Sequence, residues 1–458
     1  MDAITRPGST QQHNLSLSGA ANEGATKYYA SFNYYTQTGV LLKSDLSRYN
    51  GRLNLEQAIG RRIKMGANII ASGTKASNAS VDPTQQFERA GMIVAAIYHP
   101  ANLPLQDDAG NYTLNPLYQN APNPLSFREI TDYTINSRIL ASGFVEAKIL
   151  QGLTAKASFS WDNSTSSRYS FLPTTFLKGG NVGGEASVND NKLNSKLVEY
   201  TLNYDKSMGA YGNISALLGH SYQYRDNFYN GVYNYHLGND FSFYNIASGT
   251  NPAVSTGADP TRVWKSYFGR IIYSFKDRYV LTGSVRRDGA SHFADNKKWG
   301  TFPSISGAWI ISEEAFLKNS SKINFLKLRA GYGTVGNSEI GGSAFAYYDN
   351  GGFWKNYAYV FGNTSPIYGV GLSQQANPDL TWETARDLNF GLDFQLLKNR
   401  ISGSVDYYIR RISGLLAKVP LPTAFPISSV FINSGTSGSR GWEVSLTTKN
   451  VISKAPGG

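Results

Sequence analysis

Glycines in the last third of the chain have a spacing that could bind a dinucleotide. Residues 331–336 read GYGTVG, which matches the pattern GxGxxG after a segment that alternates apolar and polar residues. The fingerprint requires a buried parallel strand before the glycines and a helix after them, where a pyrophosphate binds. Here the preceding segment carries Lys327 and Arg329, and two adjacent glycines follow shortly afterwards. We therefore favour glycines at the rim of a barrel-like sheet over a nucleotide site.

Candidate metal ligands are few and poorly spaced. The segment DDAGN at Asp107–Asn111 has two adjacent carboxylates, but it lacks the alternating oxygen ligands and the terminal Glu of an EF-hand loop. A hairpin tip within a loop is the favoured interpretation. The five histidines are scattered, and the absence of cysteine excludes thiolate sites, cysteine nucleophiles and disulfides. The sequence predicts no metal and no cofactor.

Two further sets of residues leave alternatives open. His236 lies in the aromatic segment NFYNGVYNYHLGNDF, which could present tyrosine rings to a sugar or peptide, although ordinary loop packing is favoured. Asp387, Asp393, Asp406 and Glu443 lie at polar positions of alternating segments and could pair for general acid–base catalysis. On a barrel wall such carboxylates more often pair with Arg or Lys. The sequence therefore predicts no hydrolytic site and no enzyme.

The segments that hold these residues read as β-strands with one apolar and one polar face. Within 279–333, Leu281 and Val285 alternate with Thr282 and Arg286. Successive strand side chains point to opposite faces, so the charged face must meet water. Each segment has about ten residues, enough to cross a bilayer when tilted. This pattern is typical of an outer-membrane β-barrel.

The composition agrees with this class. The chain of 458 residues carries a net charge of +11, and its 30 tyrosines outnumber its 23 phenylalanines, as interfacial aromatic girdles require. The mean hydropathy is slightly negative, because polar strand faces dilute the apolar ones. The basic residues are spread over strands and loops rather than clustered among stacking aromatics, which argues against nucleic-acid binding.

About fifteen strands are predicted along the chain, with a short helix within 87–99. Tight connections at 150–152, 205–209, 276–277 and 397–399 alternate with long ones, including 72–135, 162–196, 225–262 and 334–380. Barrels of this class have short periplasmic turns and long extracellular loops. The first residues, MDAITRPGSTQQHN, contain no apolar signal-peptide core, and an odd strand count is unusual, so we expect a fragment of a longer product.

Several motifs resemble one family in order and spacing. RYVLTGSVRRDGASHF, KKWGTFPSISGAWIISEEAF and LKLRAGYGTVGN are similar to consecutive hallmarks of the SusC/RagA-type TonB-dependent outer-membrane transporters of Bacteroidetes. The resemblance extends from HNLSLSGA to SRGWEVSL and so covers most of the chain. It implies an all-β fold, a partial transmembrane antiparallel barrel taken from a plugged 22-stranded one. On that template, residues 1–458 are an incomplete barrel domain without signal peptide, plug and C-terminal strands.

The resemblance also implies a function, a location and partners. The whole protein would be a TonB-dependent importer of the outer membrane that takes up oligosaccharides or peptides with a SusD-like surface lipoprotein. Residues on the polar face would line the lumen: Arg52, Lys156, Arg270, Arg286, Lys327, Arg329 and Asp406. Residues on the apolar face would meet lipid: Leu281, Val285, Trp309, Leu328, Val405 and Ile409. The rival hypothesis is a soluble β-rich carbohydrate-binding protein, whose apolar strand faces would pack on another sheet.

Overall fold

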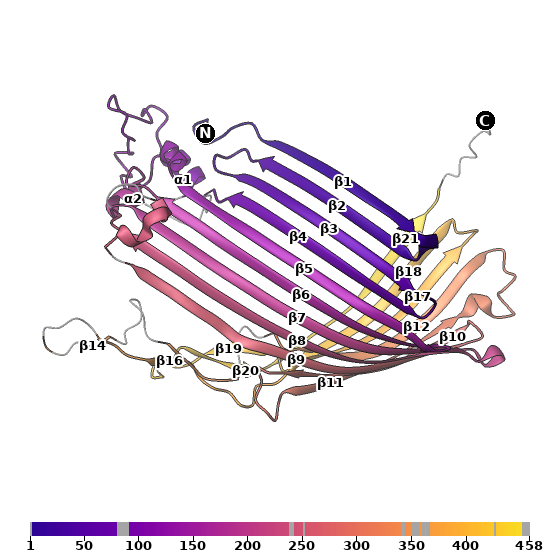
Figure 1. Cartoon of the computed structure of the whole chain (residues 1–458). Coiled ribbons are helices and arrows are strands. Elements are labelled where there is room, and N and C mark those ends of the chain that lie inside the picture. The colour runs from indigo at the N-terminus through magenta and orange to yellow at the C-terminus, as the bar shows by residue number, and fades with distance from the viewer. Residues whose placement is uncertain are drawn as a thin grey trace, which may run out of the picture. The chain divides into compact units, whose positions relative to one another are not determined.

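The computed structural model describes residues 2–79, 91–237, 242–250, 252–339, 344–349, 358–359, 362, 367–425 and 427–450. Its main element is an antiparallel sheet of fifteen strands, each hydrogen-bonded to its neighbours in chain order (Figure 1). These strands are β1 Ser9–Ala21, β2 Thr26–Thr38, β3 Asp45–Ile59, β4 Ile63–Ser77, β5 Thr131–Leu150, β6 Leu153–Leu172, β7 Glu185–Ser207, β8 Asn213–Tyr235, β9 Ala253–Phe275, β10 Tyr279–Ala290, β11 Trp299–Ile310, β12 Ile323–Asn337, β17 Glu383–Leu396, β18 Ile401–Ser413 and β21 Thr436–Thr448. The predicted all-β class, the number of strands and the unclosed antiparallel sheet are confirmed.

Tight turns join alternate strands, as the sequence predicts. Lys276 and Asp277, the first two residues of the three-residue turn between β9 and β10, have φ values of 52° and 54°, the left-handed conformation of a type I′ turn. The β17–β18 turn has three such residues in 397–399. Because these turns match the twist of the flanking strands, β10 pairs with β9, and β17 with β18, in continuous register.

The predicted loops at 162–196 and 225–262 are largely wrong. Strand β6 continues to Leu172, β7 begins at Glu185, β8 continues to Tyr235 and β9 begins at Ala253. Residues such as Ser, Asn and Thr occupy both faces of these extensions, so the alternation that marks a half-apolar strand is missing from the sequence. The backbone ladder does not depend on that alternation and continues through them.

The chain divides into two compact units. Unit 1 comprises Met1–Val145, Ser158–Leu197 and Tyr224–Thr261. It holds strands β1 to β4, which lie side by side (Figure 1), and the helices α1 (Met92–Tyr98) and α2 (Leu177–Asn181). Its largest buried cluster includes Ile4, Met92 and Phe127. The predicted short helix is confirmed as α1, while residues 80–90 lie outside the described part of the chain.

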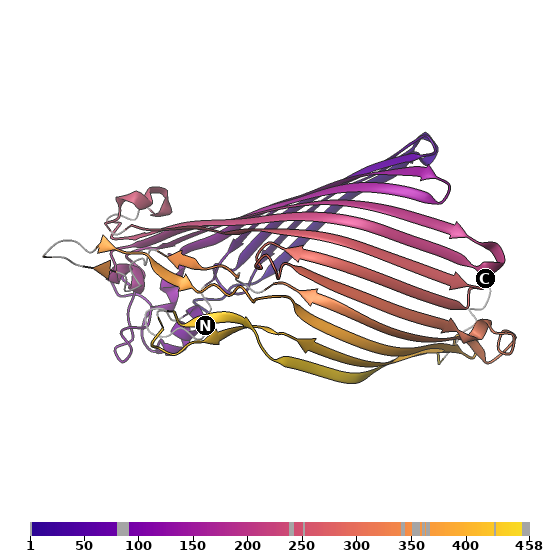
Figure 2. The same ribbon diagram turned by 90° about the horizontal axis from the view of Figure 1, so that it is seen from below.

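Unit 2 comprises Glu146–Ala157, Val198–Gln223 and Arg262–Gly458. Strands β10, β11, β12, β17, β18 and β21 run side by side in it, coloured salmon to yellow in Figure 2. Its buried cluster includes Phe293, Phe302, Leu380 and Trp382. Two short two-stranded ladders lie within the predicted loop at 334–380: β13 (Tyr347–Asp349) with β16 (Gly371–Gln374), and β14 (Ala358–Tyr359) with β15 (Ile367–Tyr368). A third, β19 (Leu416–Pro420) with β20 (Ser429–Asn433), lies between β18 and β21.

Candidate functional site: the polar face of the sheet

Strand register in unit 2 separates apolar from charged residues. Leu328 of β12 is opposite Trp309 of β11 on one side and Leu392 of β17 on the other, and Leu392 is opposite Val405 of β18. The next residue of β12, Arg329, points to the opposite face, because strand side chains alternate. This part of the sheet therefore has an apolar face and a polar face.

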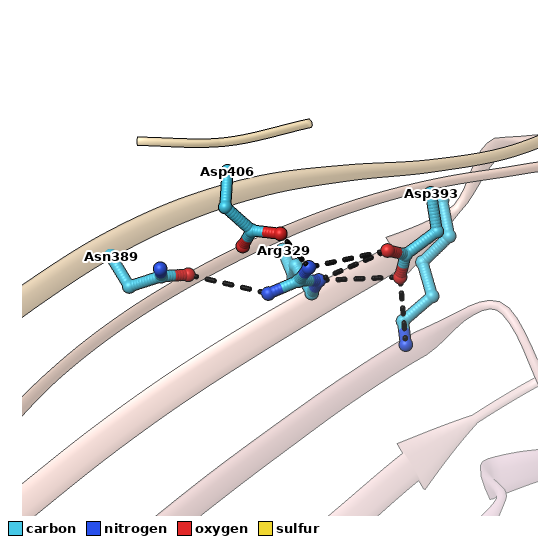
Figure 3. Close-up of polar contacts among 5 residues, drawn as sticks. Arg329, Asn389, Asp393 and Asp406 are labelled. Carbon is cyan, nitrogen blue, oxygen red and sulfur yellow. Dashed lines mark hydrogen bonds and ion pairs between the residues drawn. The ribbon is translucent and has the colours of Figure 1, made fainter. Parts of the chain in front are cut away.

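The polar face holds a network centred on Arg329 (Figure 3). The Arg329 Nη2 donates to Asp406 Oδ2 at 2.7 Å, and its Nε donates to Asp393 Oδ2 at 3.2 Å. Its Nη1 donates to Asn389 Oδ1 at 3.3 Å, and Lys327 Nζ lies 3.6 Å from Asp393 Oδ2. The structure thus brings together Lys327, Arg329 and Asp406, three of the residues predicted from sequence.

Because Gly391 has no side chain, it leaves the space in which the Arg329 guanidinium lies between the carboxylates of Asp393 and Asp406. A Cβ atom at Gly391 would lie 2.4 Å from Arg329 Cζ, so any larger residue would displace the guanidinium. The side chains of Arg329, Asp393 and Asp406 are 32%, 25% and 15% exposed, respectively. In this partly desolvated position, charge-assisted hydrogen bonds are stronger than they would be in water.

Two other predicted polar residues lie on the same face of unit 2. Arg270 of β9 is opposite Ser284 of β10. Arg286 of β10 forms a second cluster, in which its Nε lies 2.7 Å from Asp288 Oδ1 and its Nη2 donates to Ser266 Oγ at 2.9 Å. Arg286 is therefore not a member of the Arg329 network.

The remaining two predicted polar residues lie elsewhere. Arg52 of β3 is opposite Ser31 and Ile70, and its Cζ lies 5.8 Å from the ring centroid of Tyr29. Lys156 belongs to β6, in a part of that strand that falls in unit 2. That these seven polar residues line a lumen stays a prediction.

An asparagine ladder lies beside Arg52 on the polar face of unit 1. Asn50 Nδ2 donates to Asn33 Oδ1 at 3.2 Å, and Asn33 Nδ2 in turn donates to Asn14 Oδ1. Farther along the sheet is a cavity of about 440 Å³ lined by Ser, Thr and Asn side chains, Arg138, Arg225 and one leucine. This wall presents amide, hydroxyl and guanidinium groups, which suit polar ligands.

The carboxylates that could have served in acid–base catalysis are mostly ion-paired. Asp393 and Asp406 bind Arg329, while Asp387 accepts two hydrogen bonds from Arg410, at 2.6 and 2.9 Å. A general acid must hold a proton that it can deliver to a substrate, and a neighbouring guanidinium opposes that protonation. These contacts agree with the interpretation of these residues as wall charges.

The six predicted lipid-facing residues all lie on the apolar face of unit 2. Leu281 and Val285 alternate with the polar residues of β10, and Ile409 lies four residues beyond Val405 in β18. Leu281 is 52% exposed and Leu328 43%. Large apolar side chains left open over a whole sheet face need a non-aqueous partner. In the described residues, no helix has the length and apolarity to span a membrane.

An aromatic belt follows one end of the apolar face. The rings of Phe275, Tyr279 and Trp309 stack in sequence, each 6.3 Å from the next between centroids. Glu314 ties the belt to the adjoining turn, because its carboxylate accepts hydrogen bonds from Tyr279 Oη at 2.6 Å, Trp309 Nε1 at 3.0 Å and Arg278 Nη1 at 2.9 Å. These hydrogen bonds lower the pKa of Glu314, and the bond from Tyr279 makes the largest contribution. Such amphipathic rings are suited to a membrane–water interface.

A buried histidine lies at the other end of the strands, in the β10–β11 connection. His292 is 3% exposed, and its Nε2 donates to the Ser338 carbonyl at 2.7 Å. Its Nδ1 has no hydrogen-bond partner among the described residues. A second proton would therefore place an unpaired charge beside the rings of Trp264 and Phe293. Burial accordingly lowers the pKa of His292 below its usual value.

We expect acid to loosen this connection. A histidine whose pKa is lower in the folded state than in the unfolded state stabilises the fold fully above about pH 6.5, and this contribution is lost as the pH falls below that value. The amide of Ala344, which donates to the His292 carbonyl at 2.9 Å, should then exchange faster, after correction for intrinsic rates. His292→Gln, which keeps a donor for Ser338, should remove most of the pH dependence. An unchanged pH profile in the variant would contradict this account.

The other candidate motifs have structural roles. The glycines of 331–336 lie in β12, which is antiparallel to both β11 and β17, so the parallel strand of a dinucleotide site is missing. A Cβ at Gly336 would lie 2.0 Å from the Phe302 ring, which explains that glycine. The prediction of a hairpin tip at Asp107 is confirmed, since its Oδ1 accepts from the amides of Ala109 and Asn111. The aromatic segment around His236 lies mostly in β8, and its last residues, 238–241, fall outside the described chain.

Sequence reasoning missed part of this arrangement. It placed Asp393 on the polar face but did not join it to Arg329, and it did not single out Asn389, Glu314 or the asparagine ladder. Knowing the register of β12 and β17 would have placed Asp393 opposite Lys327 and only two residues from the partner of Arg329, Gly391. The described residues hold no group of three or more His, Cys, Asp and Glu that could bind a metal ion.

Comparisons with a family model and with curated proteins agree on one family. Residues 95–451 match the family model described as TonB dependent receptor-like, beta-barrel. The chain is 32% identical to TonB-dependent receptor P3 of Formosa agariphila, over 99% of this chain and 45% of that protein. It is 28% identical to TonB-dependent receptor SusC of Bacteroides thetaiotaomicron, over 99% and 46%. The chain thus spans about half the length of the curated relatives it matches.

A solved structure shares the fold over almost the whole chain. The structure of the RagAB peptide transporter superimposes with a TM-score of 0.84 and 26% identity, covering 99% of this chain and 50% of the matched chain. The similarity therefore extends over the whole fifteen-stranded sheet.

Proposed function

Because the chain belongs to the TonB-dependent receptor β-barrel family and is of the SusC/RagA type, we propose that it forms part of the wall of an outer-membrane importer. The whole protein would take up oligosaccharides or peptides, driven by the TonB complex and assisted by a SusD-like surface lipoprotein. Its location would be the cell outer membrane. It would act by binding and translocation rather than by chemical conversion.

One observation carries this proposal: a two-faced sheet of fifteen strands whose apolar face is open in unit 2. A soluble sandwich would cover such a face with a second sheet. In the part of unit 2 that the structure describes, Leu281, Val285 and Ile409 remain 52%, 49% and 40% exposed. Lipid is the partner that satisfies a continuous apolar surface beside an interfacial aromatic belt.

The two faces of the sheet would then have different roles. Arg52, Lys156, Arg270, Arg286, Lys327, Arg329 and Asp406 would line the lumen, where their charges meet water, the substrate or the rest of the importer. The asparagine ladder and the cavity beside Arg138 would add neutral hydrogen-bonding groups to the same wall. Such groups can bind either the hydroxyls of a sugar or the amides of a peptide, so this wall suits both oligosaccharides and peptides.

Deleting the gene in its native bacterium tests the function. We expect the deletion strain to lose growth on one class of oligosaccharide or peptide as sole nutrient and to regain it when the gene is restored. The tagged protein should fractionate with the outer membrane and co-purify with a surface lipoprotein. Restoring a variant whose TonB-contacting segment has been removed is the matched control, because it separates transport from simple presence in the membrane.

Some results would contradict the proposal. Recovery of the native-gene product from the soluble fraction without detergent would favour the carbohydrate-binding alternative. Normal growth of the deletion strain on every oligosaccharide and peptide pool tested would argue against a role in import, even for a protein found in the outer membrane.

A further inference from the structure

A groove of about 960 Å³ follows the apolar face of unit 2. Its floor includes the small residues Gly307 and Ala330, which are opposite one another on β11 and β12. Larger side chains flank them, with Leu281 of β10 on one side and Phe390 of β17 on the other. A Cβ at Gly307 would meet only one backbone oxygen, 3.9 Å away, so the floor is open rather than packed.

The groove ends at the turn between β9 and β10. Phe275 and Tyr279, which flank that turn, both line the groove. The exposed Lys276 lies between them in sequence, and its Nζ is 5.1 Å from the centroid of the Phe275 ring. A cation therefore lies beside one end of the apolar groove, with Asp277 as the one carboxylate in the same turn.

Positive charge prevails at this end of unit 2. The neighbouring turns and strand ends carry Lys206, Lys276, Arg278, Lys318, Lys322, Lys398, Arg400 and Lys449 against Asp205, Asp277, Glu313 and Glu314. Glu314 pairs with Arg278, and Glu313 lies 3.7 Å from Lys318. Among the described residues this leaves Lys276 without an ion-pair partner.

We propose that this groove binds one acyl chain of an anionic phospholipid, whose phosphate meets Lys276. The inference rests on the membrane location proposed above and adds a specific lipid site to it. A ligand with one long apolar part and one anionic end fits a groove with apolar walls and a cation at one end. A protein segment would need polar partners for its backbone along the groove, and the apolar side chains that line it supply few.

Paired glycine variants test the apolar half of the site. Gly307→Leu would fill the groove, whereas Gly283→Leu adds the same side chain to the same sheet face outside it, also into open space. The protein expressed from its native gene would be purified in detergent, delipidated and titrated with dioleoyl phosphatidylglycerol in native mass spectrometry. We expect Gly307→Leu to weaken the tightest binding event about tenfold, which equals the loss of roughly two buried methylene groups. Gly283→Leu should bind as the unaltered protein does.

Charge variants test the proposed contact between the lipid phosphate and Lys276. Lys276→Glu should weaken binding of phosphatidylglycerol but not of dioleoylglycerol, which has the same chains and no phosphate. Lys449→Glu, at the same end but outside the β9–β10 turn that the lining residues Phe275 and Tyr279 flank, is the control. Equal binding by the two glycine variants would overturn the site, and so would equal losses in the two lysine variants.

The outcomes also distinguish this inference from the proposed function. A photo-crosslinking residue at Ala330 should capture lipid in outer membranes, and capture of a polypeptide instead would replace the lipid with a protein partner. If the protein is found in the outer membrane but retains no phospholipid, the lipid site is contradicted and the proposed function is not. A soluble protein would overturn the proposed function and the groove together.

Discussion

Replacing Val405 with arginine is expected to lower the free energy of unfolding in bilayers by about 2–4 kcal/mol, the value for a cationic side chain near mid-membrane on the lipid face of a barrel. Val405 lies on the apolar face between Leu392 and Val444. An arginine there would have to leave its charge in hydrocarbon or distort the bilayer around it. Urea unfolding of the protein in liposomes, followed by tryptophan fluorescence, measures the loss.

The neighbouring residue provides the control. Ser404 points to the polar face and is opposite Asp393, so Ser404→Arg adds the same charge beside a carboxylate. We expect its stability to stay within about 0.5 kcal/mol of the unaltered protein, as for most surface substitutions. Equal losses at positions 404 and 405 would contradict the assignment of the two faces, and a loss at 404 alone would reverse it.

Replacing Arg329 with methionine should have the second largest effect. The change leaves Asp393 and Asp406, at 25% and 15% exposure, without the guanidinium that bridges them. We expect a loss of about 1.5–3 kcal/mol, the range for hydrogen bonds to charged groups, with Lys327 limiting the loss by its contact with Asp393. The same urea titration measures it.

Arg410→Met is the matched control for that variant. Arg410 also binds a carboxylate through two hydrogen bonds, but its side chain is 52% exposed and that of Asp387 is 36% exposed. Solvent screening should therefore hold its loss below about 1 kcal/mol. If the two arginine variants lost equal stability, the partial burial of the Arg329 network would not be its distinguishing property.

The strands of the sheet were predictable wherever one face is apolar. All fifteen strands of the sheet were identified from period-two alternation, including β10, β11 and β12, and so were the tight turns between them. The extensions of β6, β7, β8 and β9 were not, because polar residues on both faces hide the alternation. Their pairing depends on backbone hydrogen bonds, which all residues except proline can form and which leave no pattern in the side chains.

The candidate site was predictable by face but not by contact. Alternation within a strand placed Arg329 and Asp406 on the polar side, yet only the register of three strands brings them together through Gly391. A register shift of one residue would put each strand's polar side chains on the other face. The role of Glu314 could not be read from sequence at all, since it depends on how the turn after β11 folds back to Tyr279 and Trp309.

The order of strands in the sheet also bears on how the chain folds. Since every strand pairs with the one before it, each new hairpin can close as soon as its second strand is available, and most closures span only a short loop. The longest connection within unit 2 runs from Asn337 to Glu383, and its closure should be less favourable than that of the β9–β10 turn by about 2 kcal/mol in loop entropy. Pairing of β12 with β17 is thus the expected slow step within unit 2, and shortening that connection should accelerate folding more than any change in the tight turns.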